Sequence, residues 1–129
     1  MVDMIADAHL DIHREAHSTP WLMDLVFDEA NHLGFGRYFL KRTRAVEDDH
    51  LPFLDLGIPA IEIINLDYGP FNFYRHSPFD TLEKCSPATM EVVGDAVSRT
   101  TEELGGERER PLHANLNAKQ ATNYREVLQ

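Results

Sequence analysis

Two stretches of the chain carry apolar residues at the three- and four-residue spacing of an amphipathic helix. The first stretch follows Thr19-Pro20 and stops at Gly34, and its apolar positions are Leu22, Leu25, Val26 and Leu33. The second follows Ser86-Pro87 and stops at Gly105-Gly106, and its apolar positions are Met90, Val93, Val97 and Leu104. A Ser or Thr before proline is typical of a helix start and glycine of a helix end, so the pattern predicts helices over 19–33 and 87–104.

Shorter apolar runs without helical spacing predict strands and one short helix. Residues 58–64 are rich in β-branched side chains and follow Gly57, which indicates a buried strand with Glu62 as its charged exception. Residues 1–5 are apolar except for Asp3, which indicates a buried strand that ends at a polar site. Proline at position 52 favours a short helix that closes at Gly57. Segments 6–17 and 37–44 show no clear period, and we interpret both as connections.

The order strand, helix, short helix, strand, helix predicts an α/β fold built in layers. A chain of 129 residues is the size of one domain rather than two. We expect the domain to span 1–106, because residues 107–129 are polar and predict a loose tail. The sheet would contain few strands for a domain that stands alone.

Charge narrows the classes of partner. Twelve Lys and Arg against 22 Asp and Glu give a formal charge of -10, which disfavours nucleic acid and anionic membranes as partners. No apolar stretch approaches the roughly 20 residues of a membrane span, and the N-terminus lacks the layout of a signal peptide, so the compartment stays unknown. The single cysteine, Cys85, cannot form an intrachain disulfide and is interpreted as a packing residue.

Three groups of polar residues could carry chemistry. His9, His13 and His17 are four residues apart, but their segment has no helix cap or apolar stripe, so we interpret them as surface-loop histidines. The acidic run that ends in Asp48, Asp49 and His50 either caps the short helix or forms a carboxylate pair that holds a proton near neutral pH, and the residues leave both readings open.

The third candidate is His76, in the segment 68–79, which contains Gly, Pro and aromatic residues and reads as a structured loop after a strand. One loop histidine is normally a polar surface residue, because zinc needs ligands that converge from several segments. The residues around His76 change this expectation.

The sequences of three segments resemble those of the glutaminyl cyclases, which are relatives of the zinc aminopeptidases. The segments are Glu47-Asp48-Asp49-His50-Leu51-Pro52-Phe53-Leu54, Gly57-Ile58-Pro59-Ala60 and His76-Ser77-Pro78-Phe79-Asp80-Thr81. The resemblance covers roughly residues 2–104. It implies a partial three-layer α/β/α zinc-exopeptidase-like fold, a mixed sheet flanked by helices, in which residues 1–106 form the C-terminal half and the N-terminal half is missing.

The resemblance also implies roles for particular residues. His76 corresponds to the last zinc ligand of the family. Asp3 corresponds to an aspartate that ligates a second zinc in aminopeptidases and belongs to the proton-handling network of the single-zinc cyclases, where Asp48 partners it. Phe71 corresponds to an aromatic wall of the substrate pocket, and Arg75 stands where the cyclases have tryptophan. The doubled aspartate favours a cyclase over an aminopeptidase.

The activity implied by the resemblance is acyl transfer that closes an N-terminal Gln into pyroglutamate, on a peptide with a free N-terminus. A zinc ion would polarise the amide carbonyl, and a glutamate would move the proton from the attacking amine to the leaving ammonia. The family's other ligands and this glutamate are expected upstream of Asp3, so the missing half is a candidate partner. The alternatives are a metal-dependent aminopeptidase with two zinc ions and a truncated chain without catalytic activity.

Overall fold

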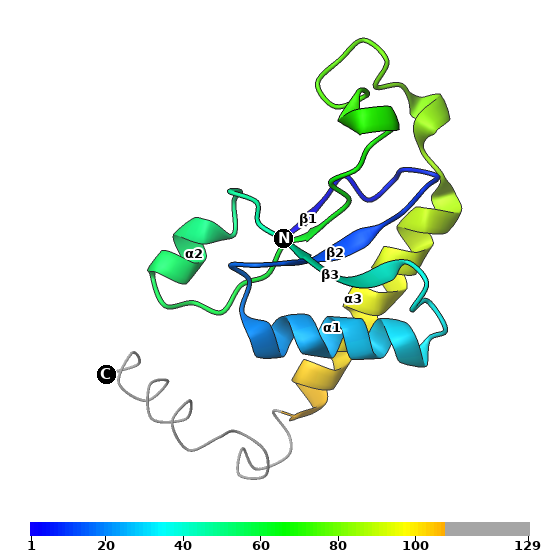
Figure 1. Ribbon diagram of the computed structural model, residues 1–129. Coiled ribbons are helices and arrows are strands. Elements are labelled where there is room, and N and C mark those ends of the chain that lie inside the picture. Colours follow the sequence, from blue (N-terminus) through cyan, green and yellow to red (C-terminus); the bar gives the residue numbers. More distant parts are fainter. Residues whose placement is uncertain (108–129) are drawn as a thin grey trace.

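The computed structural model describes residues 1–107 (Figure 1). The predicted tail from residue 108 onward lies outside the described residues. The elements in chain order are β1 (Val2–Asp3), β2 (Ile12–Glu15), α1 (Pro20–His32), β3 (Phe39–Arg44), α2 (Leu51–Asp55), β4 (Ile63–Ile64), the 3-10 turns η1 (Pro70–Asn72) and η2 (Leu82–Lys84), and α3 (Pro87–Glu107).

The short strands lie in the order β1, β4, β2, β3. β1 pairs with β4 and β2 pairs with β3, both in parallel. A single antiparallel bridge between Ile12 and Asn65 joins the two pairs. Parallel and antiparallel pairing therefore occur together, as predicted for a mixed sheet. Because β1 and β4 are parallel, their carboxyl ends lie at the same edge, and the segments that follow them begin side by side.

Helices α1 and α3 pack against each other and against the strands (Figure 1). The buried residues of α1 are spaced by three and four positions, as its amphipathic pattern predicted, and are Met23, Val26, Phe27 and Ala30. The rest of the core comes from the strands, their flanking residues and α3, namely Leu10, Ile12, Phe39, Ile61, Ile63, Val92, Val93 and Ala96. The α/β fold class and both long helices are thus confirmed.

The interpretation of two segments as connections was wrong. Segments 6–17 and 37–44, interpreted as connections, contain β2 and β3. β2 gives no alternating signal because three of its four residues are buried, among them His13 and Glu15. β3 is polar because it lies at the outside of the sheet, where charged side chains reach solvent.

The predicted strands at 1–5 and 58–64 exist but are shorter. Val2 and Asp3 pair in β1 yet are exposed rather than buried, because β1 is an outer strand among the described residues. Only Ile63 and Ile64 pair as β4, although residues 61–65 are all buried. The short helix α2 is confirmed and is followed by Gly57, whose φ of 75° only glycine adopts at low cost.

The end of the second long helix was also predicted wrongly. α3 continues through Gly105 and Gly106 to Glu107. Gly34 ends the α1 region in a left-handed conformation with φ of 81°, whereas neither glycine near the end of α3 has a positive φ. Glycine inside a helix costs only about 1 kcal/mol relative to alanine, so its presence does not by itself stop a helix. Within residues 1–107, no helix is long and apolar enough to cross a membrane.

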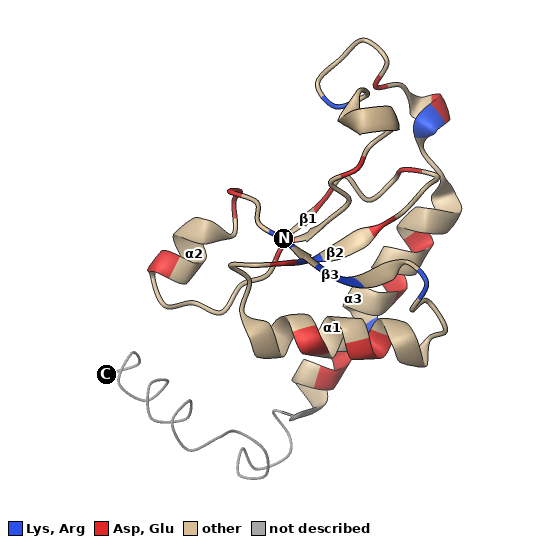
Figure 2. Ribbon diagram, in the orientation of Figure 1, with Lys and Arg blue, Asp and Glu red and all other residues tan. Residues whose placement is uncertain are grey.

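Acidic residues occur on both long helices and in the loops, whereas basic residues concentrate on β3 and near η2 (Figure 2). Three of the six residues of β3 are Lys or Arg. A hollow between the exposed faces of α1 and α3 is lined by Glu29, Arg99, Glu102 and Glu103. Arg99 already pairs there with Glu29 and Glu102, so this surface has the character of a solvated ion-pair network.

Candidate active site

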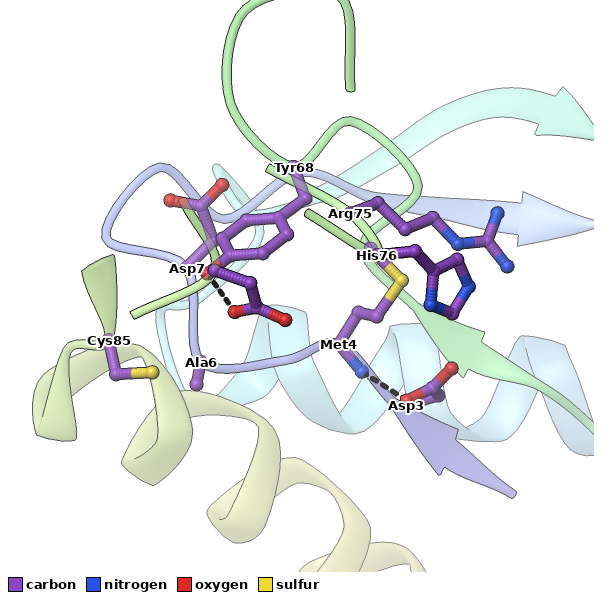
Figure 3. A pocket seen from close by; sticks show the side chains of 9 residues that line it. Asp3, Met4, Ala6, Asp7, Tyr68, Arg75, His76 and Cys85 are labelled. Atoms are coloured by element: carbon purple, nitrogen blue, oxygen red, sulfur yellow. Dashed lines mark hydrogen bonds between the residues drawn. The ribbon is translucent and has the colours of Figure 1, made fainter. Parts of the chain in front are cut away.

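A pocket of about 330 Å³ lies at the edge where β1 and β4 end (Figure 3). Asp3 is the last residue of β1 and pairs with Ile64 at the end of β4, so the loop after β4 returns beside it. The pocket is lined by Asp3, Met4, Ala6, Asp7, Tyr68, Arg75, His76, Asp80 and Cys85. Asp3 and His76, which are 73 positions apart in sequence, therefore line one pocket, as residues with the roles implied by the resemblance must.

The backbone has a positive φ directly after Asp3 and at His76. Met4, directly after Asp3, has φ of 52°, and His76 has φ of 54°. A side chain with a Cβ in this left-handed region costs about 1–3 kcal/mol, and such residues cluster at functional sites. The Met4 N–H donates to Oδ1 of Asp3 at 2.8 Å, which fixes the carboxylate at the mouth of the turn (Figure 3). Figure 3 shows His76 and Asp3 at one end of the pocket and Cys85 at the other.

The two predicted substrate-binding residues differ in position. Arg75 lines the pocket, and its buried Nε atom has no hydrogen-bond partner in the described part of the chain. Phe71 lies in η1, is fully exposed and does not line the pocket. The structure therefore brings Arg75 but not Phe71 to Asp3 and His76.

Sequence reasoning missed part of the lining. Asp7 and Asp80 add carboxylates to the pocket, and Asp80 accepts a hydrogen bond of 2.7 Å from the Tyr68 hydroxyl. This hydrogen bond, with burial as a smaller cause, raises the pKa of Tyr68 to about 12. Cys85, interpreted as a packing residue, is half-buried and lines the pocket as well.

The donors in the pocket are of the kinds that zinc accepts, because imidazole and carboxylate both ligate it. A stable zinc site takes about three or four protein ligands that converge on one point. Among residues 1–107, no group of three or more His, Cys, Asp or Glu side chains is arranged to hold a metal ion. Asp3 and His76 therefore do not make a complete zinc site by themselves.

Asp48, the third predicted site residue, does not line this pocket. Its Oδ1 accepts from the Asp49 N–H at 2.8 Å, and its backbone carbonyl accepts from the Leu51 N–H at 3.0 Å. The N-cap residue of α2 is His50, and no side chain caps this helix by a hydrogen bond. A capping role, one of the two readings of the acidic run, is thus not observed.

A buried polar cluster joins the acidic run to β2. Its members are Glu15 of β2, Ser18, His50 and Glu62, which the solvent scarcely reaches. Nε2 of His50 lies 3.0 Å from Glu15, and Nδ1 of His50 lies 3.6 Å from Glu62. Burial raises the pKa of Glu62 to about 7, the Met1 ammonium opposes this rise, and the charges of Asp48 and Asp3 add to it.

The cluster was only partly visible in the sequence. Glu62 stood out as a charged residue inside an apolar run, whereas Glu15 lay in a segment without a readable period. The histidine interpretation also needs correction, since His13 is buried in β2 and only His9 and His17 are exposed. Burial, with the charge of Arg44 as a smaller cause, lowers the pKa of His13.

Comparison with known proteins identifies the family. Residues 2–101 match the family model described as Peptidase family M28, and the chain belongs to this family. It is similar to the crystal structure of Acidobacteriales bacterium glutaminyl cyclase, with 42% identity and a TM-score of 0.75 over 78% of this chain and 36% of that chain. Porphyromonas gingivalis glutaminyl cyclase is 30% identical, with a TM-score of 0.73 over 80% of this chain and 40% of that chain.

A third similar structure is a Zn-dependent exopeptidase from Parabacteroides distasonis, which is 27% identical with a TM-score of 0.67 over 74% of this chain and 36% of that chain. Both the cyclases and the exopeptidase thus share the fold. This chain spans about 36–40% of the length of these solved structures. It is therefore a partial domain relative to them. Zinc dependence is a property of similar exopeptidases, and residues 1–107 of this chain contain no group of three or more metal-ligating side chains.

Proposed function

We propose that this chain forms the part of a zinc-dependent glutaminyl-peptide cyclotransferase-like domain that supplies Asp3, Asp48 and His76 to an active site. The observation that carries the proposal is the pocket at the carboxyl edge of β1 and β4, which Asp3 and His76 line together. The likeness to two proteins described as glutaminyl cyclases supports the same reading. Residues of the fold that this chain does not span would complete the site.

The substrate class is a peptide with an N-terminal Gln and a free amine. In the proposed reaction the α-amine attacks the side-chain amide carbon, the new C–N bond closes the ring, and the amide nitrogen leaves as ammonia after it gains a proton. His76 would contribute an imidazole ligand, as one of several, to a single zinc ion. Asp3 and Asp48 would hold protons in the carboxylate network beside the reacting groups. The general base would come with the rest of the fold.

The proposed substrate contacts involve Arg75 and Phe71. Arg75 is suited to bind an electronegative group of the peptide, because it lines the pocket and its Nε has no hydrogen-bond partner among residues 1–107. Phe71 would become an aromatic wall only if its loop moved, since its ring now lies in solvent.

Metal-dependent aminopeptidase activity is the second candidate, and the likeness to a Zn-dependent exopeptidase favours it. In that case Asp3 would ligate a second zinc ion, and the product would be a free amino acid. A chain without catalytic activity is the third candidate, because residues 1–107 hold no group of three metal ligands. The doubled Asp48-Asp49 motif favours the cyclase over the aminopeptidase.

The test combines this chain with a polypeptide that carries the remaining part of the Acidobacteriales bacterium glutaminyl cyclase fold. Zinc and a peptide with an N-terminal Gln are added, and pyroglutamate, ammonia and free amino acids are measured. The cyclase proposal expects pyroglutamate and ammonia from the mixture, and their loss in His76→Ala but not in His32→Ala, which changes an exposed histidine of α1. Release of a free amino acid would favour the aminopeptidase, and no product from a zinc-loaded, folded complex would overturn both.

A further inference from the structure

Three ionisable side chains from separate segments meet in the interior, where two carboxyl groups flank one imidazole. Glu15 comes from β2, His50 from the start of α2 and Glu62 from the residue before β4. Relative exposures are 5% for Glu15, 0% for His50 and 1% for Glu62. Charged side chains are seldom buried so deeply unless they are paired, so the pairing of each atom decides the state of the cluster.

Glu15 is held as a carboxylate by the groups that surround it. Its Oε2 accepts from the N–H of His17 at 2.9 Å, the N–H of Ser18 at 2.7 Å and the Ser18 hydroxyl at 2.9 Å. Its Oε1 accepts from the Val46 N–H at 3.2 Å. Burial acts to raise the pKa of Glu15, but these hydrogen bonds outweigh it and leave the pKa below its ordinary value.

The charge on Glu15 fixes the hydrogen on one nitrogen of His50. Nε2 of His50 lies 3.0 Å from the same Oε2 and must donate to it, because an ionised carboxylate can only accept. The other nitrogen, Nδ1, lies 3.6 Å from Glu62. Within residues 1–107, neither Nδ1 of His50 nor Oε1 of Glu62 has a hydrogen-bond partner. Without a further proton, the lone pair of Nδ1 would face the negative charge of Glu62 at a buried position.

We propose that His50 and Glu62 hold one proton between them, and that this proton locks the acidic loop of residues 46–50 onto the sheet. Glu15 anchors this loop at both ends, through the Val46 N–H and the His50 imidazole. Asp48 lies between these two anchors. Glu15, His50 and Glu62 are therefore positioning residues for Asp48, and the effect on catalysis, unlike the loop lock itself, rests on the function proposed above.

The charges that face the pair come from every neighbouring segment. The N-terminal segment contributes Asp3 of β1 and the Met1 α-amino group, whose nitrogen donates to the Ile61 carbonyl at 2.5 Å. The acidic loop contributes Asp48 and Asp49, and β2 contributes Glu15. These carboxylates favour retention of the shared proton, whereas the ammonium group favours its loss. Ser18 carries no charge, and its hydroxyl accepts a hydrogen bond of 3.0 Å from the backbone N–H of Glu62.

The test is amide hydrogen exchange of residues 46–50 in the full chain, corrected for the intrinsic pH dependence of exchange, without zinc or substrate. A carboxyl pKa of about 7 in the closed state against 4.5 in the open state gives an opening equilibrium constant that rises about tenfold between about pH 6 and pH 8. Glu62→Gln keeps the shape and can donate an amide hydrogen to Nδ1, so its loop opening is expected to be independent of pH in this range. Glu102→Gln, the same change at an exposed site on α3, is expected to behave as the wild type.

A second readout needs no variant. The nitrogen chemical shifts of the assigned His50 imidazole should show a hydrogen on Nε2, and the side-chain carboxyl carbon signal of Glu62 should change in the same pH range as the exchange. An unchanged Glu62 carboxyl signal from pH 6 to pH 8, or the same pH dependence of exchange in Glu62→Gln as in the wild type, would overturn the proposal. Both readouts are independent of enzymatic turnover, so a failure of the cyclase hypothesis would leave them intact.

Discussion

Glu15→Gln should destabilise the chain far more than its conservative chemistry suggests. The wild-type carboxylate accepts from five donors, four at Oε2 and one at Oε1. The glutamine amide has only one acceptor oxygen, so its NH₂ group must face donors on one side. The favourable orientation puts oxygen at the four-donor position and opposes the NH₂ group to the Val46 N–H.

The magnitude follows from the contacts. A hydrogen bond to a charged group contributes about 1.5–3 kcal/mol, compared with about 0.5–1.5 kcal/mol for a neutral one. Four contacts weaken and the fifth becomes a clash between donors, while the His50 imidazole loses its ionic partner. A loss of about 3–5 kcal/mol is expected, the range measured when one partner of a buried pair is removed. Such a loss is a large part of the roughly 5–15 kcal/mol that stabilises a typical domain.

Urea unfolding of the full chain at neutral pH, followed by circular dichroism, measures the loss. Glu102→Gln is the matched control, because its side chain is 67% exposed and should change stability by less than about 0.5 kcal/mol. The acid side of the stability curve gives a second check. The folded-state pKa of Glu15 is lowered, so its contribution is present above the unfolded pKa and is lost as pH falls, and Glu15→Gln should remove that part. A loss below about 1 kcal/mol at neutral pH would refute the role of Glu15 as an anchor.

Three further predictions concern packing, pH and association. Ile12→Ala, at a fully buried core position, should cost about 2–5 kcal/mol in urea unfolding, whereas Ile58→Ala, at a position 47% exposed, should cost much less; equal losses would contradict the assigned core. The folded-state pKa of Glu62 is raised from 4.5 to about 7, so its stabilisation is present below pH 4.5 and is lost as pH rises through about 7; unfolding at pH 5 and pH 8 should show this fall in the wild type and not in Glu62→Gln. Val2 is exposed on β1, which pairs only with β4 among residues 1–107, so one edge of β1 is open to another chain. The chain should therefore self-associate on size-exclusion chromatography, and Val2→Lys should reduce this association. A monodisperse wild-type monomer with a sharp thermal transition would contradict the prediction.

The elements that were predictable from sequence are those whose burial is one-sided. α1 and α3 each place apolar residues on one face, and each begins at a proline, so the apolar spacing and the helix-start signal predicted the same elements. β2 could not be predicted because His13 and Glu15 are buried in polar surroundings and break the alternation. β3 could not be predicted because its outward residues are basic. Gly105 was misleading, since only the backbone conformation decides whether a glycine ends a helix.

The candidate site divides in a similar way. Asp3 and His76 were found because the segments around them resemble those of the glutaminyl cyclases. The parallel pairing of β1 and β4 explains why the two residues meet. Asp48 was found by the same route but lies outside the pocket lining. Asp7 joins the pocket only through tertiary contacts, and the anchoring of the acidic loop by Glu15 depends on a contact across 35 positions of sequence. Neither leaves a local pattern.

The central claim is that this chain contributes His76 and Asp3 to a zinc-dependent cyclase site that the rest of the fold completes. The most direct measurement is the release of ammonia and pyroglutamate from an N-terminal Gln peptide, by the chain alone and with the complementing part of a glutaminyl cyclase. The account predicts no turnover by the chain alone and zinc-dependent cyclisation by the complemented chain, with loss of that activity in His76→Ala. Zinc-dependent cyclisation by the chain alone, well above its His76→Ala variant, would contradict the account, as would a folded complex whose activity does not depend on His76.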